Sequence, residues 1–316
     1  MATSSSDNFS TTRNKIIDAA FRKIGIVAEG EAASGQMVDD AALDLERMVK
    51  VAQAAGLHLW KYEEMILFLD KDQQKYVLGP STSEHWLKSS DLISTTLSAA
   101  SVANDTSMTV TSITGIAASD NVGVVLDDNT IHWTTVSGTP SGSTVTLTTG
   151  VASAAASGNV LYAYKNKAVK PLAITQVRTR IDSNSELTHQ MLSRDEYFSL
   201  ANKAATGSAI QSYYSPRLLD GNFYPWPTSD DEREFLNLTA QIQIEDLDAA
   251  GNNPDFPSEW YDALVWNLAK RLLTEYGIVD PMTVQLVLGM AQETYDFAEA
   301  FDAEETNIVF MPDYDG

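Results

Sequence analysis

The stretch from Leu92 to Tyr164 contains no Lys, Arg or Glu, and this absence constrains the fold more than any other feature of the sequence. Ser, Thr, Ala and Gly crowd there around short β-branched runs. Two parts of the stretch resemble each other, TSMTVTSITGIAASDNVGVVL at 106–126 and GSTVTLTTGVASAAASGNVLYAY at 142–164. Each part alternates strand patterns with turn residues, and TIHWTT between them is a further strand pattern. We therefore predict an inserted all-β sandwich or barrel domain at 92–164, built from two related halves.

Helical periodicity marks both ends of the chain. Apolar residues recur at the helical period in four segments, 10–25, 36–55, the stretch between Ser258 and Gly277, and 281–303. Ser258 is a good N-cap, Gly277 can end a helix in the left-handed conformation, and Pro281 suits a first helical turn. Ser193 and Glu196 have the spacing of a capping box, which predicts a short helix after them.

Shorter apolar runs outside the β stretch predict antiparallel strands. MILFLD and QKYVL flank an acidic turn and predict a hairpin, and PLAITQVRTRI predicts a strand. AIQSYYSP, GNFYPWP and EFLNLTAQIQI predict a meander. The predicted fold class is therefore α+β. It has a helix-rich body, residues 1–91 and 165–316, with short antiparallel hairpins, interrupted by the inserted β domain at 92–164.

Composition limits the chemistry. With no cysteine, the chain has no disulfides and no thiolate ligands or nucleophiles. The four histidines, His58, His85, His132 and His189, stand at no metal or catalytic spacing. We therefore expect no metal, no cofactor and no enzymatic activity. The formal charge of -22 argues against gripping nucleic acid or an anionic membrane over the whole surface. No apolar run approaches the roughly 18 residues of a membrane span, so we expect no membrane partner.

Three groups of residues are candidates for contacts with other molecules. Trp266 lies between Asp262 and Lys270 on the charged side of its predicted helix, which predicts an exposed tryptophan at a subunit interface. Arg178 and Arg180 end a basic run and would share one strand face, available to DNA phosphates or an acidic subunit, or simply to solvent. A C-terminal arm, residues 304–316, holds a short apolar run, Ile308, Val309, Phe310 and Met311, which we expect to be covered either by the chain's own helices or by another chain.

Several motifs together resemble a known family. They are NKIIDAAFRKIGIVAEGEAASGQMVDDAALDLERMVKVAQAAGLHLW, then LSRDEYFSLANKAATG with the following SYYSP and FYPWP, and PDFPSEWYDALVWNLAKRLLTEYG. In this order they resemble head-to-tail adaptor proteins of short-tailed bacteriophages, the connector or head-completion proteins. The resemblance covers most of the chain outside residues 92–164, the β stretch that the compact members lack.

The resemblance implies a structural virion protein and no enzyme. Such adaptors are largely helical and form a twelve-membered ring beneath the portal, which they connect to the tail nozzle while double-stranded DNA passes through the centre. The expected partners are therefore the portal protein, a tail nozzle or tail tube protein, other copies of the chain, and passing DNA. The expected location is the virion neck, after assembly in the host cytoplasm. C-terminal arms in this family reach the portal, which would give residues 304–316 that role.

Two other classes stay open at this point. The Ser/Thr-rich β stretch could recognise host-surface carbohydrate with Trp133 as a stacking platform, which would make the chain a tail-associated adhesin. The simpler explanation is that Trp133 occupies a core position, because it lies in an alternating strand pattern. A tail-associated hydrolase has only scattered carboxylates in its favour.

Overall fold

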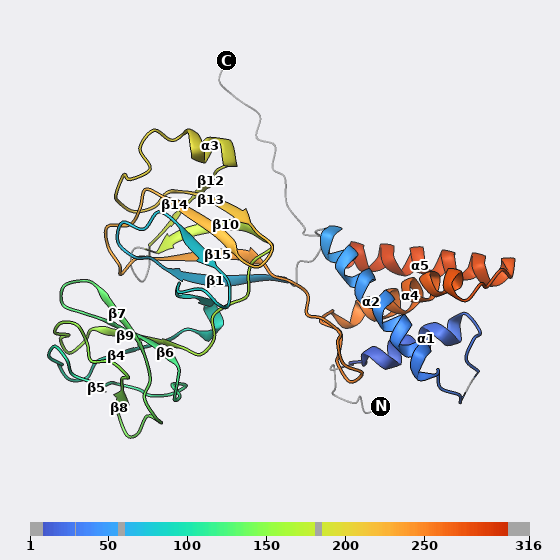
Figure 1. The fold of residues 1–316 in the computed structure, drawn as a ribbon, viewed down its shortest axis with the longest axis horizontal. Coiled ribbons are helices and arrows are strands. Elements are labelled where there is room, and N and C mark those ends of the chain that lie inside the picture. The colour runs from blue at the N-terminus through green and yellow to red at the C-terminus, as the bar shows by residue number, and fades with distance from the viewer. Residues whose placement is uncertain (1–8, 29, 56–60, 181–184, 303–316) are drawn as a thin grey trace, which may run out of the picture. The chain divides into compact units, whose positions relative to one another are not determined.

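The computed structural model describes residues 9–28, 30–55, 61–180 and 185–302. The chain divides into two compact units, which Figure 1 shows as a group of helices and a group of strands. The helical unit comprises residues 1–61 and 244–316, and the β unit comprises residues 62–243. The chain therefore passes from one unit to the other twice.

The predicted fold class is wrong. Fifteen strands in four sheets are found among the described residues, and five α-helices accompany them. Strands on both sides of the 92–164 stretch belong to the same β unit as that stretch, so there is no helix-rich body interrupted by a small β domain. The prediction failed because it treated the strands outside 92–164 as local hairpins, whereas they pair with strands far away in the sequence.

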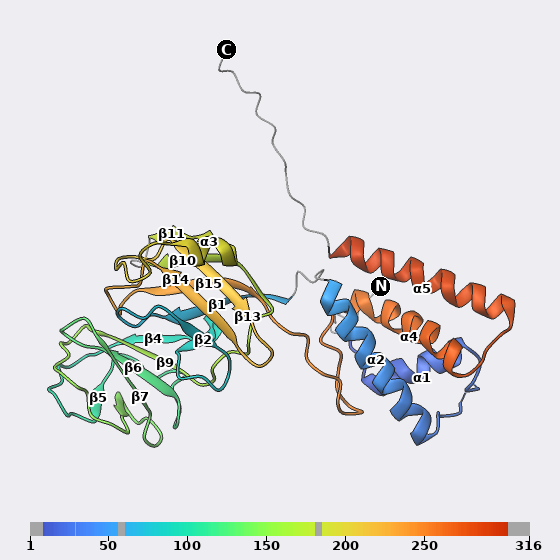
Figure 2. The same cartoon turned by 45° about the horizontal axis from the view of Figure 1, so that its top comes forward.

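The helical unit is built around one central helix. Its elements are α1 (Arg13–Lys23), α2 (Gly35–Ala55), the 3₁₀ helix η3 (Ser258–Trp260), α4 (Tyr261–Glu275) and α5 (Pro281–Phe301). All four α-helices fall where helical periodicity predicts them. α4 packs against α1, α2 and α5, and Figure 2 shows α5 running along α4. No helix in the described part of the chain is long and apolar enough to cross a membrane.

Local signals set the helix ends. Gly277 has φ 62° after α4, a conformation that glycine adopts without strain. Before α5, the carboxylate of Asp280 accepts a hydrogen bond from the backbone N–H of Thr283 at 2.9 Å, and Pro281 occupies the first turn. The connection between α4 and α5 is therefore short and defined by its caps.

Two sheets outside the 92–164 stretch enclose a common core in the β unit. The five-stranded sheet has the order β11-β10-β15-β1-β3, and the four-stranded sheet has the order β12-β13-β14-β2. The strands of the first are β1 (Tyr62–Phe68), β3 (Trp86–Lys88), β10 (Ala173–Arg180), β11 (Glu186–Thr188) and β15 (Phe235–Gln241). Those of the second are β2 (Tyr76–Leu78), β12 (Gln190–Met191), β13 (Gln211–Pro216) and β14 (Gly221–Trp226). The short helix α3 (Arg194–Ser199) has the predicted capping box of Ser193 and Glu196.

The predicted strand pairings are only partly correct. β13 and β14 form the expected hairpin, but β15 leaves them and pairs with β1 and β10 in the other sheet. β1 and β2 form no hairpin, because β2 pairs with β14 in the four-stranded sheet. β1 instead has β15 as a partner, from Tyr62 opposite Gln241 to Phe68 opposite Phe235.

The 92–164 stretch forms two further sheets with their own apolar core. Its strands are β4 (Ile93–Thr96), β5 (Ser107–Thr109), β6 (Asn121–Val125), β7 (Ile131–Thr135), β8 (Thr144–Thr146) and β9 (Val160–Tyr164), preceded by the 3₁₀ helix η2 (Ser89–Asp91). Strands from the two similar halves pair with each other, β5 with β8 and β6 with β9, both antiparallel. Met108 lies opposite Val145, its counterpart in the repeat. The sequence repeat therefore corresponds to two halves related by an approximate two-fold axis.

β1 is buried on both faces over its second half. Met65 and Leu67 of β1 join the core shared with the four-stranded sheet. Ile66 and Phe68 point the other way and belong to a cluster with residues of the 92–164 stretch. Phe68 has its ring centroid 4.9 Å from that of Trp133 and 4.9 Å from that of Tyr162. This double burial explains the uninterrupted apolar run in β1, since a strand covered on one side only would alternate.

Candidate functional site

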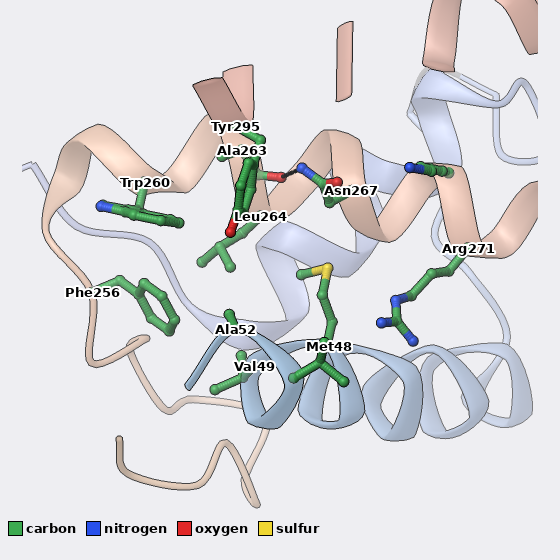
Figure 3. Close-up of a pocket in the computed structure, with 12 residues that line it drawn as sticks. Met48, Val49, Ala52, Phe256, Trp260, Ala263, Leu264, Asn267, Arg271 and Tyr295 are labelled. Carbon is green, nitrogen blue, oxygen red and sulfur yellow. Dashed lines mark hydrogen bonds between the residues drawn. The ribbon is translucent and has the colours of Figure 1, made fainter. Parts of the chain in front are cut away.

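A groove of about 440 Å³ opens on the helical unit between α2 and α4, with Tyr295 of α5 at its side (Figure 3). Most of the side chains that line it are apolar, and its cations come from α4. The lining residues are Met48, Val49, Val51, Ala52, Phe256, Trp260, Ala263, Leu264, Asn267, Lys270, Arg271 and Tyr295. Such a surface suits the apolar face of another peptide segment better than it suits a small polar ligand.

Aromatic rings form one end of the groove. The centroids of Phe256 and Trp260 lie 5.8 Å apart, and Trp260 meets Tyr295 edge-on at 5.9 Å. These rings lie where the loop before η3 meets α4 and α5. Pro254 and Pro257 keep that loop out of a helix, so Phe256 can turn toward α2 (Figure 3).

Asn267 fixes the wall between α4 and α5. Its side-chain amide donates to the backbone oxygen of Ala263 at 2.9 Å and to that of Ala291 on α5 at 3.1 Å. One side chain therefore bonds to both helices, which holds α5 against α4 beside the groove.

The other end of the groove is positively charged. Lys270 and Arg271 lie one after the other in the second half of α4, and both line the groove. Neither forms an ion pair with another described residue. Arg271 also lines a hollow with Asp40, Asp44 and Glu275, so Lys270 offers the charge that a partner's carboxylate would meet first.

A second apolar surface lies on α5. We define the α5 stripe as four side chains and give their exposed fractions: Met282 80%, Leu286 56%, Phe297 69% and Phe301 62%. The spacings of four, eleven and four residues place them within an arc of about 100° on an α-helix. α5 buries Val287, Ala291 and Ala298 on an adjacent side, about 110° around the helix from the centre of the stripe. Glu293 falls within the same arc, between Leu286 and Phe297, and lines a hollow beside Phe297 together with Asp296, so the stripe carries acidic charge at its Phe297 end.

The groove and the α5 stripe face different ways. Tyr295 lines the groove, whereas Phe297 belongs to the stripe. Two residues along an α-helix correspond to a rotation of about 200°, which places these side chains on nearly opposite sides. The helical unit therefore has two distinct apolar surfaces that can be occupied at the same time.

Trp266 is not exposed, so the basis for predicting it as an interface anchor is wrong. Its side chain is only 7% exposed, in the core of the helical unit, and the Nζ of Lys23 lies 4.4 Å from its ring centroid. The physical reason is that α4 packs against three helices, so a side chain off its main apolar arc is buried by α1. Asp262 and Lys270 are exposed as predicted, and Lys270 lines the groove.

The two basic strand candidates have different surroundings. Arg178 forms ion pairs with Glu64 at 2.5 Å and with Glu186 at 3.1 Å, so its charge already has partners within the β unit. Arg180 lines a cleft with Tyr162 and Phe235, and its guanidinium carbon lies 5.6 Å from the centroid of Phe235. They therefore do not form the free basic strip that DNA contact would use.

The remaining candidates lie in the C-terminal arm and on β7. The portal-contact candidates Ile308, Val309, Phe310 and Met311 lie outside the described residues. Trp133 stacks on His85, with centroids 3.7 Å apart and planes at 13°. Its ring also lies against Gly123, where an added Cβ would come within 2.7 Å of it. Trp133 is therefore a packing residue of the β unit and not the open sugar platform that the adhesin alternative requires.

Two buried histidines have structural contacts. Nδ1 of His85 and the hydroxyl of Tyr164 share a hydrogen bond of 2.7 Å, and burial lowers the pKa of His85 to about 3, helped by the nearby charge of Lys167. His189 bonds to the hydroxyls of Thr179 and Ser212, both at 2.5 Å, and burial lowers its pKa to about 4. Ser212 is itself fully buried. The His189 and Ser212 pair therefore lies out of reach of a substrate.

No group of three or more His, Asp or Glu that could hold a metal ion occurs in the ranges that the structure describes. Comparison of the sequence with protein-family models and with curated protein sequences gives no match.

The sequence analysis predicted neither the groove nor the α5 stripe, although the stripe could have been found from the sequence. In the segment 281–303, Met282, Leu286, Phe297 and Phe301 remain after the inward-facing residues are assigned, and they share one side of the helix. The sequence gives no signal for the groove, because Val51 and Trp260 come to line one surface only when α2 and α4 pack.

Proposed function

We propose that the chain is a structural virion protein, a subunit of a ring that joins the portal vertex of a phage head to the tail and forms part of the DNA conduit. The observation that carries this proposal is the pair of separate apolar surfaces on the helical unit, the groove and the α5 stripe. The resemblance to head-to-tail adaptors supplies the specific setting. Two of its three groups of motifs include residues of the helical unit.

A ring subunit needs two different surfaces. Contacts in a cyclic ring larger than a dimer are heterologous, so each copy offers one patch to the copy before it and another to the copy after it. Patches of this kind are apolar at their centres and polar at their rims. The groove and the α5 stripe both fit this description, because charged residues flank each of them.

The charge of the chain suits a passage for DNA. A formal charge of -22 on each copy would give a ring a negative field that repels phosphates and lets the duplex slide. Arg178 is paired with two carboxylates, which also agrees with a surface that does not hold DNA.

Electron microscopy of the purified chain, alone and mixed with its portal, tests this function. The expected result is an added ring at one end of the portal, with one copy of the chain per symmetric position. Absence of added density at stoichiometric excess and moderate salt would contradict the proposal.

A matched control distinguishes specific ring formation from non-specific association through exposed apolar side chains. Leu218 and Leu219 lie in the β unit with 89% and 83% of their surface exposed. Changing both to Ser removes exposed apolar area from the β unit and leaves the helical unit unchanged, so ring formation should be unaffected.

A further inference from the structure

We propose that the α5 stripe of one copy docks in the groove of a second copy, with α5 lying parallel to the α4 that lines that groove. This inference rests on the proposed function, because it names the contact that joins neighbouring ring subunits. The committed occupant of the groove is therefore helix α5 of another copy of this chain.

The two surfaces match in length and character. Along η3 and α4 the groove extends from Trp260 to Arg271, and along α5 the stripe positions Leu286 and Phe297 have the same separation in residues. Each distance is about 16 Å at 1.5 Å per residue. A helix with apolar residues on one side is the usual occupant of an apolar groove between two helices. Phe297 and Phe301 supply the large aromatic side chains that commonly anchor such contacts.

Charge sets the direction of α5 in the groove. The groove is cationic at its Lys270 and Arg271 end and aromatic at its Trp260 end. Glu293 and Asp296 lie near Phe297, whereas Asp280, the acid near Met282, is engaged by Thr283 as the N-cap of α5. Placing these acids on the cations brings Leu286 toward Trp260, and α5 then runs in the same direction as the α4 of its neighbour.

Docking in this way leaves each copy with one free surface, to which a further copy can bind. Because the groove and the α5 stripe lie on nearly opposite sides of α5, the first copy keeps its groove and the second keeps its stripe. The contact is therefore heterologous and extends from copy to copy until it closes.

The lack of cysteine makes a crosslinking test clean. In the docked arrangement, Leu286 lies near the Val51 side of the groove, and both side chains are largely exposed in a single copy. The Leu286→Cys and Val51→Cys variants are mixed and oxidised, with and without the portal. The expected product is a crosslinked dimer that neither variant gives alone, at least tenfold above the control pair of Leu218→Cys with Val51→Cys. One chain with both changes should give a ladder of crosslinked multimers.

Other products would overturn the proposal. Crosslinks between two Leu286→Cys chains would indicate that stripes pair with each other, and a Phe297→Cys with Val51→Cys product in place of the expected one would reverse the direction of α5. Absence of the expected dimer from rings already assembled on the portal would place the subunit contact elsewhere. A dimer that forms only after deletion of residues 304–316 would make that arm the usual occupant of the groove.

Binding measurements complete the test with two substitutions at exposed positions. Phe297→Glu and Val51→Glu should each weaken self-association by roughly 30-fold or more, the effect of losing an interface anchor. An equal mixture of the two should form dimers and stop there, because only one intact groove and one intact stripe meet. If rings form on the portal but the two substitutions do not weaken self-association, the proposed function stands and the docking of α5 in the groove is wrong. If crosslinked ladders form but never bind the portal, the docking is right and the proposed function is wrong.

Discussion

Trp266 shows how far a single residue can be assigned from its neighbours in a helix. Its flanking charges, Asp262 and Lys270, are exposed, yet the ring between them is buried beneath Lys23 of α1. A helical wheel gives the direction of a side chain but not the number of helices that surround it. That number depends on tertiary packing, which no local pattern contains.

Trp266→Ala should therefore destabilise the helical unit. Removing a buried tryptophan leaves a cavity and costs about 3–5 kcal/mol of unfolding free energy. Urea unfolding followed by far-UV circular dichroism measures the loss. Phe297→Ala, on the exposed side of α5, is the control and should change stability by less than about 0.5 kcal/mol. Equal small effects for both variants would show that Trp266 is not core.

His85 should make the β unit less stable as the pH falls. Burial lowers its pKa from 6.5 to about 3, so between these values the unfolded chain takes up a proton that the folded chain does not. His85 therefore does not lower the free energy of unfolding above pH 6.5. Below that pH the free energy of unfolding declines, by up to about 1.4 kcal/mol per pH unit for one such group.

His85→Phe isolates this contribution. The ring can still stack on Trp133, but the proton uptake disappears, so the variant should lose less stability than the wild type between pH 7 and pH 5. Urea unfolding at several pH values measures both slopes. Parallel curves for the two proteins would mean that His85 titrates normally in the folded state.

At the scale of elements, the sequence predicts what local chemistry decides and misses what distant pairing decides. The structure confirms the predicted helix ends at Ser193 and Gly277, and it adds Asp280 as the N-cap of α5. The partner of β1 could not be predicted, since β15 lies more than a hundred residues away and any apolar strand would fit the pattern. The groove between α2 and α4 was missed for the same reason.

The 92–164 stretch and the five-stranded sheet should depend on each other. Ile93 pairs with Ala163, so a short Gly/Ser linker can replace the stretch without moving its ends. Its removal uncovers Phe68 and Phe235. Burial of each of these side chains stabilises the folded state by about 2 kcal/mol. We expect the excised chain to keep its helical circular dichroism but to aggregate through the β unit.

Compensating substitutions distinguish this loss of cover from a general failure to fold. Adding Phe68→Thr and Phe235→Thr to the excised chain should reduce aggregation, because polar side chains then face water. Size-exclusion chromatography and thermal melting provide the measurements. An excised chain that stays monomeric without these changes would show that the stretch covers nothing essential.

At the scale of the whole molecule, we expect the arm at residues 304–316 to take part in binding the portal. It has four consecutive apolar residues, Ile308 to Met311, between the sequences EETN and PDYDG. An arm that orders on docking gains apolar burial and loses chain entropy, which makes binding sensitive to its removal. Deleting 304–316 should leave a folded protein that no longer co-sediments with the portal at matched salt. Retained portal binding would assign that contact to another surface.

The two passages of the chain between its units affect how the protein is made. α1 and α2 leave the ribosome first, but α4, the helix on which both pack, follows about 200 residues later, a delay of roughly 10–40 s at ordinary synthesis rates. The whole β unit is translated in the interval. The groove needs Val49 from α2 and Leu264 from α4, so it does not exist on a nascent chain that lacks its last helices. A chain that is still being translated therefore has no complete docking surface, and the order of synthesis itself delays assembly until each copy is finished.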